Sequence, residues 1–168
     1  MRKIDENGLK LCKMQADVFV ISGAKLECSS LIFMRRFMKS KVARRMDTGD
    51  FLFEACDANQ IIDEINIEFG RSSYGKEKYS EDELYWMGYL YRYWSYTYQK
   101  DSKQIYKLIK PKELRTLYYP YHSLDPAQAI ERILEAKGLA EEDFTARGVK
   151  IMREIMKKEG KKSGEYHR

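Results

Sequence analysis

Apolar side chains recur at helical spacing along most of the chain, and the densest case is SEDELYWMGYLYRYWSYTYQ, residues 80–99. One face of a helix over this stretch carries Leu84, Met87, Gly88, Tyr91 and Tyr98. The other side is also apolar, with Trp86, Tyr89, Leu90, Tyr93 and Tyr96. Because a helix that is apolar on most sides is normally buried or covered by a partner, we predict that it is the central helix of the protein.

Polar residues mark where this helix begins. Ser80 followed by Glu83 is the pattern of a capping box, in which the two residues satisfy each other's backbone N–H groups. Glu81, Asp82 and Glu83 place negative charge in the first turn, where the helix dipole favours it. The helix is therefore expected to start directly after Ser80.

The other apolar patterns predict an all-α fold. A helix over residues 9–22 is predicted to end at Gly23, and a strand over residues 18–21 is the alternative. Asp57 and Asp125 are suitable N-caps, Pro111 suits a first helical position, and Pro120 is a predicted stop. Further helices are predicted over residues 29–46, 57–69, 102–109, 111–119, 125–138 and 149–156. We expect one globular helical domain over residues 1–138, followed by a C-terminal amphipathic helix and a flexible tail over residues 139–168.

Charge changes sign abruptly along the chain. Residues 1–46 contain eleven Lys or Arg and four Asp or Glu, whereas residues 47–70 contain seven Asp or Glu and no Lys or Arg. The overall charge of +5 is too small to indicate a nucleic-acid partner by itself. We expect the basic and acidic helices to pack as neighbours, joined by surface ion pairs worth less than about 1 kcal/mol each.

An alternative use of the basic helix is contact with a partner of opposite charge. Its cations could neutralise phosphates, and residues 97–119 also have the short helix, turn, short helix order of a DNA-binding motif. The helix after Pro111 offers the mixed set Lys112, Glu113 and Arg115 where base-reading side chains are needed, which weakens that interpretation.

Aromatic residues are concentrated in one part of the chain. Twelve of the thirteen tyrosines and both tryptophans lie between Tyr74 and Tyr121. A buried helical core is the simplest explanation. The alternatives are stacking on single-stranded bases, aided by Arg92, Lys103 and Lys107, and recognition of a protein, since Tyr, Trp and Arg dominate interface hot spots.

Catalytic and metal-binding patterns are weak. HExxH, GxSxG, Walker A and GxGxxG are absent from the sequence. His122 is expected to be a hydrogen-bonded turn residue, and Cys12, Cys28 and Cys56 to be reduced packing residues of a cytoplasmic protein. A magnesium site is conceivable only on the acidic segment, from Asp57, Asp63, Glu64 and Glu68. We therefore predict no catalytic residue, no cofactor and no metal, and no membrane association, because no apolar run reaches the length of a span.

Four strings carry a resemblance to a known group. They read SSxxFxRRFM, YWxGYLYRYW, SKxIYK and YHSLDPxxAIERI, and they cover residues 27–138. In these strings the chain resembles a group of small bacterial proteins that are similar to antitoxin components of toxin–antitoxin loci, found near toxins of ADP-ribosyltransferase type. The resemblance implies a cytoplasmic helical antitoxin that binds and blocks its toxin, and it identifies no functional residue.

These observations predict a binding protein without catalysis, and most directly an antitoxin whose partner is its cognate toxin. A DNA-binding regulator using residues 31–46 is the first alternative, and a metal-dependent enzyme of unrecognised type is the second. A homo-oligomer is compatible with either binding role. The expected partner or nucleic-acid contacts are Arg35, Arg36, Lys39, Arg44, Arg45, Trp86, Tyr89 and Tyr93.

Overall fold

The structure is a computed structural model that describes residues 1–139, 153 and 155–157. Within these residues the chain is helical and contains no strand, which confirms the predicted all-α class and rules out the alternative strand over residues 18–21. The elements are α1 (Glu6–Lys25), α2 (Ser30–Met38), α3 (Lys41–Thr48), the 3-10 turn η1 (Asp50–Phe53), α4 (Ala58–Phe69), α5 (Glu81–Tyr98), α6 (Ser102–Leu108), α7 (Pro111–Thr116), α8 (Tyr118–Tyr121) and α9 (Pro126–Ala136).

The chain divides into two compact units, Met1–Ala127 and Gln128–Arg168. The second unit contains most of α9, whose apolar stripe is Ala129, Ile130, Ile133 and Leu134. The predicted domain limit at residue 138 stays a prediction. Of the predicted helix over residues 149–156, residues 153, 155 and 156 are described and are helical, and the other five lie outside the described residues. None of the helices in the described part combines the length and apolarity that a membrane crossing requires.

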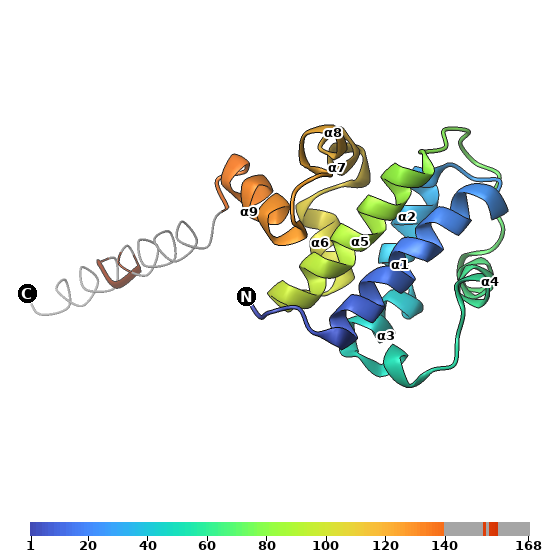
Figure 1. Cartoon of the computed structure of the whole chain (residues 1–168), viewed down its shortest axis with the longest axis horizontal. Helices are drawn as coiled ribbons and strands as arrows, with labels where there is room; N and C mark the ends of the chain where they lie inside the picture. The colour runs from blue at the N-terminus through green and yellow to red at the C-terminus, as the bar shows by residue number, and fades with distance from the viewer. Residues whose placement is uncertain (140–152, 154, 158–168) are drawn as a thin grey trace, which may run out of the picture. The chain divides into compact units, whose positions relative to one another are not determined.

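Helices α1 and α5 lie side by side and run in opposite directions (Figure 1). Their closest approach is at Gly88, where an added Cβ would lie 3.0 Å from the Cα of Ala16 and 2.9 Å from Cγ of Phe19. Any side chain at position 88 would therefore push the two helices apart. The absence of a side chain at Gly88 lets α5 lie directly against the backbone of α1.

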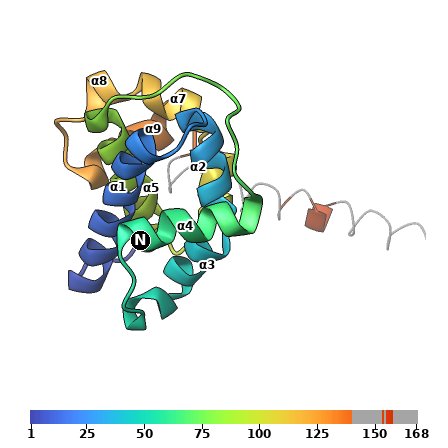
Figure 2. The same ribbon diagram turned by 90° about the vertical axis from the view of Figure 1, so that its right-hand side faces the viewer.

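The core of the first unit is built around this helix pair. Phe19 of α1 makes edge-to-face contacts with Phe33 and Phe37 of α2, at ring-centroid distances of 5.5 and 5.2 Å. On α5, Trp94 is fully buried, and the Tyr91 hydroxyl donates a hydrogen bond to the Ile109 carbonyl at 2.7 Å. Helix α4 lies across α1, α2 and α3 (Figure 2). The prediction that residues 80–99 form a central, largely buried helix is confirmed.

Several predicted helix ends are confirmed by their hydrogen bonds. Ser80 caps α5 by accepting from the Glu83 backbone N–H at 3.2 Å, but the predicted return bond is replaced, since the Glu83 carboxylate accepts from the Ser80 hydroxyl at 3.0 Å. Asp57 forms a complete capping box with Gln60 at the start of α4. Gly70 ends α4 with a positive φ of 77°, and Pro111 occupies the first turn of α7. Short-range capping chemistry therefore sets these boundaries as expected.

Other predicted boundaries are wrong. Helix α1 continues through Gly23 to Lys25 because the packed neighbour α5 supports it there. The predicted helix over residues 29–46 is two helices, since the Ser40 hydroxyl accepts from the Ala43 N–H and starts α3. Pro120 lies inside the short α8 instead of ending a helix. Helix α6 is capped by the Asp101 side chain, which accepts from the Gln104 N–H, so the Ser102 hydroxyl makes other bonds.

The close approach at Gly88 is testable by substitution. We expect Gly88→Ala to lower the free energy of unfolding by about 1–3 kcal/mol, because the new methyl group overpacks against the backbone of α1. Gly23→Ala is the matched control in the same helix pair, since its Cβ meets only the flexible Leu84 side chain at 3.0 Å. The control should be neutral or gain up to about 1 kcal/mol from helix propensity. Urea unfolding measures both, and equal effects would contradict the packing described.

Candidate functional site

The five basic residues singled out in the sequence do not form one free surface. Arg36 donates to the Gly70 carbonyl at 2.5 Å and stacks over Phe69. Arg45 pairs with Glu54 at 2.8 Å and with Glu64 at 2.6 Å. The side chains of Arg35, Lys39 and Arg44 are exposed on α2, at its C-cap and on α3. Arg36 and Arg45 are thus used inside the fold, and Lys39, although exposed, lies over the Tyr106 ring at 5.3 Å from its centroid.

The acidic segment is engaged with the basic one, as the charge pattern predicted. Besides the Arg45–Glu64 pair, the Glu68 carboxylate accepts from the backbone N–H of Lys41 at the start of α3, at 2.8 Å. Asp57 caps α4. These carboxylates act at separate places, and no group of three or more potential metal ligands occurs among the described residues.

A buried polar network joins helices that are distant in sequence. Arg92 is only 1% exposed, and its guanidinium pairs with Asp47 at 2.6 Å. It also donates to Gln15 Oε1 at 2.7 Å and to the Ser102 hydroxyl at 2.8 Å. Asp47 Oδ2 accepts from the Ser102 backbone N–H at 3.0 Å, so the carboxylate also holds the first turn of α6. The network fastens α1, α3, α5 and α6 together.

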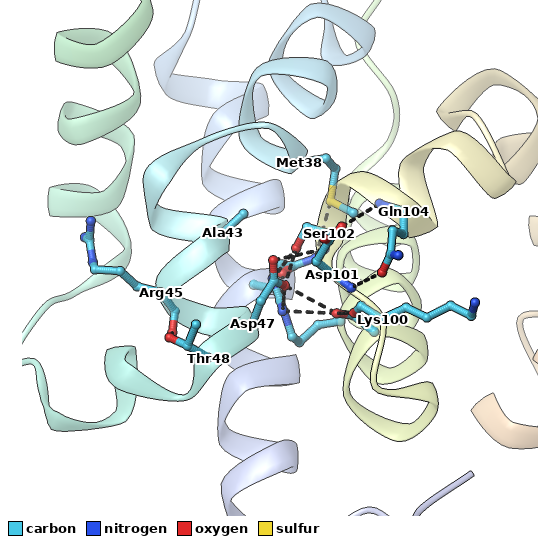
Figure 3. Close-up of polar contacts among 12 residues, drawn as sticks. Met38, Ala43, Arg45, Asp47, Thr48, Lys100, Asp101, Ser102 and Gln104 are labelled. Atoms are coloured by element: carbon cyan, nitrogen blue, oxygen red, sulfur yellow. Dashed lines mark hydrogen bonds and ion pairs between the residues drawn. The ribbon is translucent and has the colours of Figure 1, made fainter.

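Figure 3 shows that Arg45 and Asp47, two residues apart near the end of α3, point in different directions. Asp47 points toward Ser102 at the start of α6, whereas Arg45 points to the other side of α3. There Arg45 pairs with Glu64 of α4 and with Glu54, which follows η1. The sequence placed Arg92 among base-stacking cations, and the structure instead buries it. The one sequence signal for this role was an arginine in the middle of an otherwise apolar helix, because such a charge needs a buried partner.

One flank of α5 carries an aromatic surface, in which Tyr85 and Tyr89 lie roughly 60° and 100° around the helix from Gly88. Positions 86 and 88 are two residues apart, so their side chains point roughly 200° apart around the helix. Tyr85, Tyr89 and Tyr93 stack at successive turns, with centroid distances of 6.2 and 6.3 Å. Tyr85 is 41% exposed and Tyr89 half-buried, whereas Tyr93 is only 8% exposed. Of the predicted aromatic contacts, Trp86 and Tyr89 are therefore accessible and Tyr93 is nearly covered.

The aromatic surface borders a hollow of about 350 Å³. Trp86 packs edge-to-face on Tyr118 of α8 at 5.7 Å, and Tyr118 stacks on the His122 ring at 4.5 Å. His122 Nδ1 lies 2.9 Å from the Tyr118 carbonyl, so the expectation of a hydrogen-bonded turn residue is confirmed. The lining residues are Asp82, Tyr85, Trp86, Tyr89, Leu90, Tyr118, His122, Leu124 and Pro126. We call this feature the aromatic hollow.

Burial favours the neutral forms of two tyrosines of α5 and of a cysteine of α1. Burial raises the pKa of the Tyr89 hydroxyl to about 12, and burial also raises that of Tyr93. Burial raises the pKa of the Cys12 thiol to about 12, so it is protonated at neutral pH, as a packing role requires. The aromatic hollow therefore presents neutral rings, with the Asp82 carboxylate among its lining residues.

Comparison with models of protein families, with curated proteins and with solved structures gave no match. The function is accordingly argued from the chemistry of the surfaces described above.

The buried Arg92–Asp47 pair carries a strong stability prediction. We expect Asp47→Ala to lower the free energy of unfolding by about 3–5 kcal/mol, because it leaves the Arg92 charge buried without its partner. Arg45→Ala, two residues away, breaks only partly exposed pairs and should cost less than about 1 kcal/mol. Replacing both partners, Asp47→Leu with Arg92→Met, should recover much of the loss. Equal effects of the two single substitutions in urea unfolding would contradict this account.

Proposed function

We propose that this protein is a non-catalytic binding protein, and specifically an antitoxin that captures a partner toxin through the aromatic hollow and its rim. The observation that carries the proposal is the half-exposed aromatic surface of Tyr85, Trp86 and Tyr89, beside a hollow of about 350 Å³. Tyr and Trp are enriched at interface hot spots because they bury large areas at small entropic cost.

The toxin as partner is supported by the resemblance over residues 27–138. Two of the four strings that carry the resemblance also supply the hollow: YWxGYLYRYW contributes Tyr85, Trp86 and Tyr89, and YHSLDPxxAIERI contributes His122 and Leu124. A partner that buries these rings would gain apolar area on the partly exposed flank of α5. The interface would then be organised around one helix and one turn.

The direct test is co-expression with the product of the neighbouring gene. We expect a tagged copy of this protein to co-purify with that product and to restore growth of cells that express it. The double substitution Tyr85→Ala with Trp86→Ala should weaken the complex about 30-fold or more, the effect of losing hot-spot residues. The matched control is the double substitution Arg35→Ala with Arg44→Ala, which removes two exposed cations on α2 and α3. The affinity of this variant for the partner should stay within about threefold of that of the unsubstituted protein. Absence of both binding and neutralisation would contradict the proposal.

Nucleic acid is a second candidate partner, favoured by the exposure of Arg35, Lys39 and Arg44. These cations would contact phosphates, so binding to a duplex from the protein's own promoter should weaken steeply between low and moderate salt. The Arg35→Ala with Arg44→Ala variant should lose that binding, whereas the Tyr85→Ala with Trp86→Ala variant should retain it. A gel shift at two salt concentrations measures this, and a shift insensitive to salt or to the arginine substitutions would contradict it.

A further inference from the structure

We propose that the aromatic hollow takes a cationic side chain, a lysine or an arginine of the bound protein, held over the rings of Trp86, Tyr85 and Tyr89 with its charge toward Asp82. This inference rests on the proposed function, in that the guest belongs to a protein partner. It specifies the chemical group that the partner must present.

The walls of the hollow have the geometry that a cation requires. Rings from two segments meet there, because Trp86 stands edge-to-face with Tyr118 at an interplanar angle of 76° while Tyr85 and Tyr89 lie nearly parallel, at 23°. Ring faces carry negative quadrupole potential, and Trp is the most favourable ring for binding a cation. A volume of about 350 Å³ has room for the end of a lysine or arginine side chain.

The protein already uses this chemistry for its own cations, at other rings. Arg2 lies 3.7 Å from the centroid of Tyr96, Arg115 lies 4.0 Å from that of Tyr79, and Lys110 lies 4.1 Å from that of Tyr106. Among the described residues, no lysine or arginine lies over the rings of Trp86, Tyr85 or Tyr89. The rings that line the hollow are therefore not already used by a lysine or arginine of the described residues.

Negative charge lies beside these rings. Asp82 lines the hollow and is exposed, whereas its neighbour Glu83 is already paired with Arg115 at 2.5 Å. Burial, and after it the charges of Asp82 and Glu83, raises the pKa of the Tyr118 hydroxyl. The field in the hollow therefore favours a positive guest over an anion or a neutral chain of similar size.

The experiment uses four small probes and the full-length, ¹⁵N-labelled chain. The probes are N-acetyl-arginine amide and N-acetyl-lysine amide, and their neutral counterparts N-acetyl-citrulline amide and N-acetyl-norleucine amide. The indole N–H signal of Trp86 reports the hollow, and that of the fully buried Trp94 is the internal reference.

We expect the cationic probes to shift the Trp86 signal in a saturable way, with no shift of the Trp94 signal and little response to the neutral probes. Asp82→Asn should weaken that binding by up to about fivefold, the effect of losing one exposed ion pair. Glu81→Gln, an adjacent exposed acid that does not line the hollow, is the matched control. Equal responses to citrulline and arginine, or no response of Trp86, would overturn the inference.

The same variants separate this inference from the proposed function. A complex with the neighbouring gene product that forms with unchanged affinity in Asp82→Asn and in Tyr85→Leu overturns the cation site and leaves the antitoxin role standing. A Trp86 response to arginine without any capture of that product supports the cation site and removes the antitoxin role. Circular dichroism of each variant confirms that it is folded.

Discussion

The antiparallel contact between α1 and α5 is the interaction on which the rest of the first unit depends. Gly88 brings the two helix backbones together at Ala16, and that contact directs one side of α5 into the core. The helix is apolar on most of its circumference, so the side turned away from α1 still carries large rings. The same contact therefore fixes both the core and the exposed aromatic surface.

A second constraint is the buried charge on α5. Arg92 lies near the α1 side of the helix, where it reaches Gln15, and it requires Asp47 to compensate its charge. Asp47 in turn binds the first turn of α6 through Ser102. The Arg92–Asp47 ion pair thus positions α3 and α6 against the α1–α5 helix pair. Its role is structural. The aromatic hollow lies apart from that network, lined by α5 residues of other turns and by the segment around α8.

The sequence predicts the features of this structure that depend on interactions between residues close together in the chain, and it misses those that depend on distant residues. Ser80, Asp57 and Pro111 act on backbone groups within a few residues, and the helix starts they predict are confirmed. The Arg92–Asp47 pair joins residues 45 positions apart, and no local pattern reveals such a contact. The sequence predicts a helix stop at Gly23. The helix continues past it because α5 packs beside it, and that tertiary contact leaves no mark in the local sequence. In the hollow, spacing identified Trp86 and Tyr89, whereas the part played by Tyr118 and His122 depends on how α8 folds back beside α5.

The central claim is that the aromatic flank of α5, and not the basic helices, meets the partner. Hydroxyl-radical footprinting of the complex with the neighbouring gene product tests it most directly, because tyrosine and tryptophan are reactive when exposed. The account predicts that complex formation protects Tyr85, Trp86 and Tyr89 together with the segment 118–122, and leaves residues 31–46 unchanged. Protection confined to Arg35, Lys39 and Arg44, with the aromatic hollow still reactive, would contradict it.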